Sequence, residues 1–253
     1  MRTYFRRLTG HRRDQEANRH LGYSLAFIAG AMNAGGFLAI GKYTSHMTGM
    51  VSGIADHLAL GELALVLAGL ASLAAFVLGA ITTAILNNWA RRRHLRSQYA
   101  MILMLEAALL LVFGIAGAFL ATLHDLLAPV TILLLCYIMG LQNAIITKIS
   151  GAEIRTTHIT GITTDIGIEI GKMLYLSHKP DAPPVTANRP KLALHLRLFG
   201  SFLAGGIIGA ISFKHIGYSA TIPLAIWLLI LAALPVFDDL KLQWWLYRHH
   251  RHE

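Results

Sequence analysis

Two polar motifs occur twice in this chain, about half its length apart. Each copy reads G-x-x-N-A and is followed about a dozen residues later by [ST]-H-x-T-G-x-x-[ST]. Amide, hydroxyl and imidazole groups exchange hydrogen bonds with a solute, and imidazole also takes up a proton near neutral pH. Glycine allows a ligand or another backbone to approach closely. The candidate solute-binding residues are Asn33, Ser45, His46, Thr48 and Gly49 in the first copy and Asn143, Thr157, His158, Thr160 and Gly161 in the second.

The second motif has the pattern of a helix start. Ser45 or Thr157 is a good N-cap, and free backbone N–H groups follow it. The N-terminus of a helix is partly positive, which suits an anion or a carbonyl oxygen. The alternative is that these residues only cap short helices, and that Asn33 and Asn143 only hold neighbouring helices together. We favour a binding site, because polar groups inside an apolar chain are costly and are commonly functional.

Two acids are candidates for coupling solute movement to a proton or cation. Glu106 lies about two turns inside an apolar run, where an acid is expensive. Its alternatives are snorkelling toward Arg96 and pairing with another helix. Asp165 follows Thr164 in the second copy, where the first copy has Gly53, so it breaks the symmetry of the repeat. No spacing typical of zinc ligands or of an enzyme motif is present. We therefore predict no catalytic residues, no metal and no cofactor.

The composition predicts an all-α membrane protein. Of the 253 residues, 55% are hydrophobic and 14% are charged, whereas soluble domains carry about a quarter charged residues. Six apolar runs have the length of about 20 residues that a bilayer requires. These expected transmembrane helices are Leu21–Gly41, Leu63–Leu86, Tyr99–Thr122, Leu126–Ile146, Leu196–Gly217 and Ala220–Phe237.

The basic residues predict the orientation in the bacterial inner membrane. With the N-terminus in the cytoplasm, the inner segments carry 18 Lys and Arg residues, and the outer segments carry only Lys42 and Lys214. Such an excess marks the cytoplasmic side, so both termini are expected there. The expected organisation is a basic cytoplasmic arm at 1–20, a single transmembrane domain at 21–238 and a cytoplasmic tail at 239–253, with a Pro-rich linker around Ser177–Arg189.

The duplicated motifs predict two halves, 21–122 and 126–237. The polar segments 44–60 and 156–175 are expected to be short half-helices that re-enter the membrane or lie along its surface. Three crossings in each half make the second copy inverted, as in many secondary transporters. Faces of small residues on the second and fifth runs, including Gly79 and Gly205, serve contacts within one chain or in a homodimer.

The predicted function is therefore transport of a small polar or anionic solute through a site between the two half-helices. The alternatives are a structural or sensor membrane protein and, less favoured, a membrane-embedded enzyme. Its partners would be the lipid bilayer and the solute. Nucleic acid is not expected, since the basic residues follow the membrane topology.

The sequence resembles a known family of membrane proteins. Ala29–Leu38 reads A-G-x-x-N-A-x-G-F-L, and Thr48–Ser52 reads T-G-x-x-S. Together with six apolar runs, these motifs are similar to the YoaK-like family of bacterial six-span membrane proteins of unknown function, over roughly residues 20–240. That family usually has Asp at the position of Asn33 and Asn at that of Met50. The resemblance implies a fold but no activity. By fold analogy alone, paired half-helices look like the core of sulfate-permease and nucleobase transporters.

Overall fold

The chain forms helices along almost all of its described length. The computed structural model describes residues 15–41, 43–93, 95, 97–120, 124–175 and 185–249. This part contains helices and turns but no strand, which confirms the predicted all-α fold. In chain order the helices are α2 (Gln15–Ile40), α3 (Met47–Ala59), α4 (Leu63–Arg92), α5 (Ala100–Leu120), α6 (His124–Ile149), α7 (Ile159–Leu174), α8 (Arg189–Ile216), the short 3₁₀ helix η1 (Gly217–Ala220) and α9 (Thr221–His249).

Within the described residues, five stretches are long and apolar enough to cross a membrane. They are Asn18–Leu38, Leu63–Arg92, Ala100–Phe119, Leu127–Ile149 and Arg189–Ala233. The last stretch runs through α8 and η1 into α9, so it contains one of the six runs expected from the sequence and most of another. These helices indicate a multi-pass membrane protein.

The surface of α4 agrees with a lipid environment. Leu67, Val77, Ile81 and Ile85 are all exposed along this helix. Water would make such a long apolar surface unfavourable, whereas lipid tails are as apolar as these side chains.

Helices α2 and α8 pack with their backbones in contact. Gly30 lies against the carbonyl of Phe202, and Gly205 lies against the carbonyl of Phe27, with no space for a Cβ atom at either glycine. Further along both helices, Gly35 meets the ring of Phe213. The contacts advance together along the two helices, so α2 and α8 run in the same direction.

Helices α4 and α6 repeat this arrangement. Gly79 lies against the carbonyl of Tyr137, and Gly140 lies against the carbonyl of Phe76. The Thr83 hydroxyl also donates to the Leu141 carbonyl at 3.0 Å. The small-residue faces predicted from the sequence are therefore used inside one chain, where they allow helices to approach closely.

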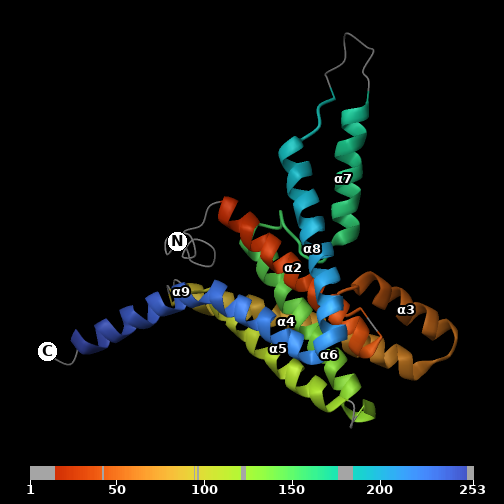
Figure 1. Cartoon of the computed structure of the whole chain (residues 1–253), viewed down its shortest axis with the longest axis horizontal. Helices are drawn as coiled ribbons and strands as arrows, with labels where there is room; N and C mark the ends of the chain where they lie inside the picture. The colour runs from red at the N-terminus through yellow and green to blue at the C-terminus, as the bar shows by residue number, and fades with distance from the viewer. Residues whose placement is uncertain are drawn as a thin grey trace.

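The α2–α8 pair and the α4–α6 pair run in opposite directions. The start of α2 lies beside the end of α6, where Asn18 Nδ2 donates to the Ile149 carbonyl at 3.3 Å. Arg19 lies 3.8 Å from Glu153 in the loop after α6, and Gly22 packs on Ile154. Because α2 and α6 lie side by side (Figure 1), these contacts make them antiparallel.

Three predicted regions lie partly outside the described residues. Of the basic arm, residues 1–14 are not described, and α2 begins inside it at Gln15. Most of the Pro-rich linker, residues 176–184, is also outside the description. At the other end, α9 continues to His249 through the segment expected to be the tail.

Candidate functional site

Each copy of the second motif begins a short helix, at the places expected from the sequence. Helix α3 packs beside α4, and α7 packs beside α8 (Figure 1). The N-caps differ from the prediction: they are His46 and His158, and neither side chain makes a capping hydrogen bond. Ser45 and Thr157 lie one residue before the cap.

The hydroxyls before the caps are used elsewhere, which explains the difference. Ser45 Oγ donates to Asn33 Oδ1 at 2.8 Å, and Thr157 Oγ1 donates to Asn143 Oδ1 at 2.8 Å. Asn143 is itself oriented by a 2.8 Å bond from its Nδ2 to the Met139 carbonyl. Each bond ties the start of a half-helix to the preceding long helix. The structure therefore brings each candidate Asn together with its hydroxyl.

The two histidine rings fold back over the first turn of their own helices. A Cβ atom at Gly49 would overlap the His46 ring, and one at Gly161 would overlap the His158 ring. The close approach that these glycines permit is thus by the neighbouring imidazole. Both rings are exposed. The candidates Thr48 and Thr160 are also exposed, on the first turns of α3 and α7.

The two motifs line two separate cavities. Groove one has a volume of about 470 Å³ and is lined by residues of α3, α4 and the start of α6, including His46, Met50 and Leu133. Groove two has a volume of about 210 Å³ and is lined by the loop before α7 and by α7 and α8, including His158 and His195. No residue lines both.

The distance along α2 separates the two motifs further. Gly22 packs beside the loop before α7, and Asn33 bonds the loop before α3. These two residues are 11 positions apart, which is about 16 Å along a helix axis. A solute site shared by the two half-helices therefore stays a prediction.

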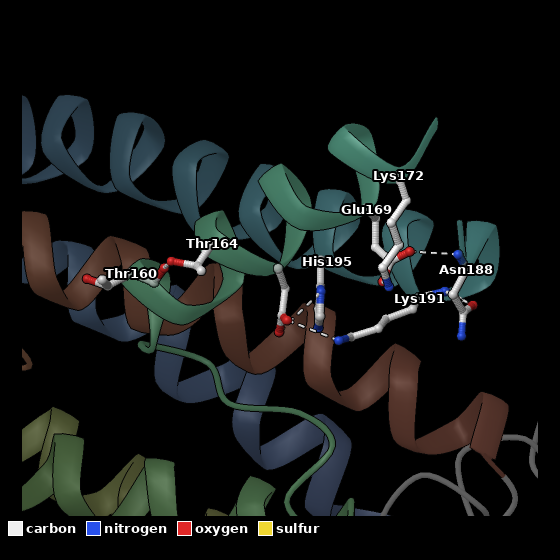
Figure 2. Close-up of polar contacts among 8 residues, drawn as sticks. Thr160, Thr164, Glu169, Lys172, Asn188, Lys191 and His195 are labelled. Atoms are coloured by element: carbon white, nitrogen blue, oxygen red, sulfur yellow. Dashed lines mark hydrogen bonds and ion pairs between the residues drawn. The ribbon is translucent and has the colours of Figure 1, made fainter. Parts of the chain in front are cut away.

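Groove two contains charged residues from both of its helices. The Asp165 carboxylate on α7 accepts a hydrogen bond from Lys191 Nζ at 3.0 Å and lies 3.8 Å from His195 Nδ1. Lys191 and His195 point toward α7 from one face of α8 (Figure 2). The hydrogen bond from Lys191 holds the pKa of Asp165 below its usual value, assisted by the charges of Lys191, His195 and His158.

Sequence reasoning found Asp165 but missed Lys191 and His195. They stand 26 and 30 residues after Asp165, on another helix. Only the packing of α7 on α8 brings them together, so spacing alone could not reveal them. In the described residues, no group of three His, Cys, Asp or Glu side chains is placed to hold a metal ion.

A second polar contact fastens the far end of α7. Glu169 is nearly fully buried, accepts a bond from Lys172 Nζ at 2.8 Å and accepts another from the Asn188 backbone N–H at 2.6 Å. These two donors lower the pKa of Glu169 (Figure 2). The end of α3 has a comparable contact, in which His57 Nδ1 and Glu62 Oε2 lie 2.6 Å apart.

The other coupling candidate lies in neither groove. Glu106 on α5 is fully buried in the helical core, against the side chain of Gln142 on α6.

The comparisons with known proteins identify a family without a known activity. A model of the family described as "Protein of unknown function (DUF1275)" matches residues 21–234. The chain belongs to this family. The match includes both motif copies and both grooves. No curated protein and no solved structure matches the chain. Membership thus supplies no substrate, and the YoaK-like resemblance stays an expectation.

Proposed function

We propose that this chain is a transporter of a small polar or anionic solute in the bacterial inner membrane. In this proposal α2, α4, α5, α6, α8 and α9 cross the membrane, and α3 and α7 are half-helices on its two sides. The excess of basic residues supports cytoplasmic termini. The opposite directions of the two parallel helix pairs support an inverted repeat of three spans in each half.

One observation carries the proposal: groove two has an unused polar atom beside a helix start. His195 is only 6% exposed, and its Nδ1 has no hydrogen-bond partner in the described part of the chain. Buried polar atoms are nearly always paired in native proteins. An atom in a cavity wall that has a carboxylate 3.8 Å away but no hydrogen bond therefore favours a partner that enters from outside, such as an oxygen of a solute.

The surroundings of His195 favour a small solute with negative charge. The cavity of about 210 Å³ excludes large molecules. Its two acids already have cationic neighbours, because Asp165 pairs with Lys191 and Glu153 lies 3.8 Å from Arg19. Arg155 in the wall adds a further positive charge. The first turn of α7 adds backbone N–H groups and a partial positive charge.

In this mechanism the two grooves serve the two sides of the membrane. Groove two would receive the solute on the cytoplasmic side, where the inner segments are basic. Groove one would receive it on the outer side, at His46 and the first turn of α3. The transport step would be a rearrangement of the half-helices on the rigid α2–α8 and α4–α6 pairs.

The test is uptake by proteoliposomes that contain the purified chain, with labelled sulfate, phosphate, acetate and glycine as probes. We expect at least one probe to enter faster than into empty liposomes. His195→Leu should slow this uptake about tenfold, the usual effect of losing one hydrogen bond to a charged group. His215→Leu, at an exposed histidine of the same helix, is the matched control and should transport normally.

Two results would contradict transport. If no probe enters faster than into empty liposomes, the proposal fails as stated. If calorimetry detects binding of a probe that is not transported, the sensor alternative is favoured instead.

A further inference from the structure

Two polar side chains are sealed in the apolar core between α5 and α6. Glu106 and Gln142 are both 0% exposed. Their side chains lie against one another. Yet neither carboxyl oxygen, nor the amide oxygen and nitrogen, has a hydrogen-bond partner in the part of the chain that the structure describes. Buried polar groups without partners are rare and usually have a functional cause.

The donors and acceptors of the pair balance only when a proton is added. An ionised carboxylate accepts hydrogen bonds and donates none, and the amide oxygen of Gln142 also only accepts. A neutral carboxylic acid can donate its O–H to the Gln142 oxygen while its carbonyl accepts from the Gln142 nitrogen. This pairing would satisfy both side chains, whereas ionisation would leave an unpaired charge in an apolar core.

Nothing nearby on the described helices offers a compensating charge. Glu106 is the only charged residue of α5. The neighbouring helices carry their charges elsewhere: Arg91 and Arg92 end α4, Lys148 stands in the last turn of α6, and α9, which packs on α5, has no charged residue from Thr221 to Phe237. The polar groups around η1, Tyr218 and Thr221, contact α5 near Gly114, about two turns from Glu106.

We propose that Glu106 and Gln142 form a proton-binding site. One carboxyl and one amide offer too few oxygen ligands for a metal cation, which takes about six, but they suffice for one proton. The pair does not repeat, because the residue equivalent to Gln142 in the first motif copy is Met32.

The position of Gln142 connects this site with groove two. The next residue, Asn143, accepts the Thr157 hydroxyl that ties the start of α7 to α6. Loss of the proton would require Glu106 to gain water or another partner, and so would disturb α6 at the turn that holds α7. Protonation of Glu106 would in this way change groove two. This coupling, unlike the proton site itself, rests on the proposed transport.

Infrared spectroscopy of the purified chain in lipid tests the proton site without any assumption about transport. At neutral pH we expect the carbonyl stretch of a protonated carboxylic acid, with the downshift in heavy water that identifies an O–H group. Glu106→Gln should remove the band, and Glu62→Gln, at an exposed acid, should leave it unchanged. A spectrum without the band, or a band that survives in Glu106→Gln, overturns the site.

A second variant keeps the test decisive if Glu106→Gln does not fold. Gln142→Met introduces the residue that the first half uses at this position. It should retain the band but shift it upward, toward that of an acid without a hydrogen bond. An unshifted band would overturn the pairing with Gln142.

The coupling is tested by uptake of the transported probe with and without an inward proton gradient. The parent should respond to the gradient, and Glu106→Gln should transport at a rate that the gradient does not change. If the infrared band is present but the parent ignores the gradient, the coupling is wrong and the proton site stands. If no probe is transported, the proposed function fails while the infrared result still decides the proton site.

Discussion

Groove one and groove two have the same arrangement of a long helix and a half-helix, here called the frame, but they differ in their charged side chains. In both, an Asn of a long helix accepts a hydroxyl before a half-helix, and a histidine ring covers a glycine in the first turn. The charges occur only in groove two. The residues that face each other there are Asp165, Lys191 and His195. The repeated motif places Gly53 opposite Asp165, and matching the packed glycines Gly79 and Gly205 places Leu65 and Gly69 opposite Lys191 and His195.

This difference separates the residues that position the half-helices from those that we propose to be functional. The motifs that occur twice are engaged in local contacts, so their first role is to position each half-helix. His195 and the pair Glu106–Gln142 have unused bonding capacity and stand at positions that do not repeat. The positions shared by the two motif copies hold the half-helices, and the groups that we propose to be functional stand where the copies differ. The following predictions test this division, from the largest expected effect to the smallest.

The largest loss of folded protein should come from substitutions at the packed glycines of the frame, and the loss should be equal in both halves. Gly30→Val and Gly140→Val place a side chain where a backbone carbonyl already lies. Overpacking of this kind costs about 1–3 kcal/mol or more, and here no flexible side chain can yield. We expect both variants to lose the monodisperse peak in size-exclusion chromatography. Gly167→Val, at a helical glycine with open space around it, is the control and should keep it. A normal peak for only one of the two core variants would break the equivalence of the halves.

The next largest loss of thermal stability should differ between the contact at the end of α7 and the contact at the end of α3. Glu169→Leu removes a nearly buried acceptor of two hydrogen bonds, so the Asn188 N–H loses its acceptor. His57→Leu breaks only an exposed contact with Glu62. A hydrogen bond exposed to water contributes less to the stability of the fold than one shielded from water. The midpoint of thermal unfolding should therefore fall clearly for Glu169→Leu and little for His57→Leu. Equal shifts would contradict the asymmetry.

A smaller and symmetric effect is expected where each half-helix is tied to its long helix. Ser45→Ala and Thr157→Val each remove one hydroxyl donor of a 2.8 Å bond. Losing such a bond typically costs about 1 kcal/mol. The two variants should lower the unfolding midpoint by similar amounts. A large fall in probe uptake without a change in stability would instead assign these hydroxyls to the solute.

Most helices of the frame could be predicted from the sequence, but the side chains that meet in the grooves could not. Apolar length and the repeated motifs predicted the long helices and both short helices, but not the hydrogen bond between each Asn and its hydroxyl. They failed at His46 and His158, because the cap depends on which acceptor Ser45 and Thr157 reach. They also missed His195, because its neighbours are set by the rotation of α7 against α8. Periodicity shows that a helix has an apolar face but does not fix its register on a neighbour.

The smallest effect concerns acid sensitivity, which groove two should have and groove one should lack. The hydrogen bond from Lys191 lowers the pKa of Asp165 in the folded chain. A group with a lowered folded pKa stabilises the fold above its unfolded pKa, about 4 for Asp, and this stability is lost as the pH falls through the folded pKa. The side chains of Asp165 and Lys191 are 37% and 42% exposed, so solvent screens the pair and its contribution should stay below about 1 kcal/mol. Asp165→Asn should therefore lower the unfolding midpoint slightly at pH 7, and the difference from the parent should shrink well below pH 4.

Asp56→Asn, at an exposed acid of α3, is the matched control and should follow the parent at every pH. If Asp165→Asn and Asp56→Asn have the same pH profile, the ion pair does not stabilise groove two, and the contrast between the grooves is limited to their shape.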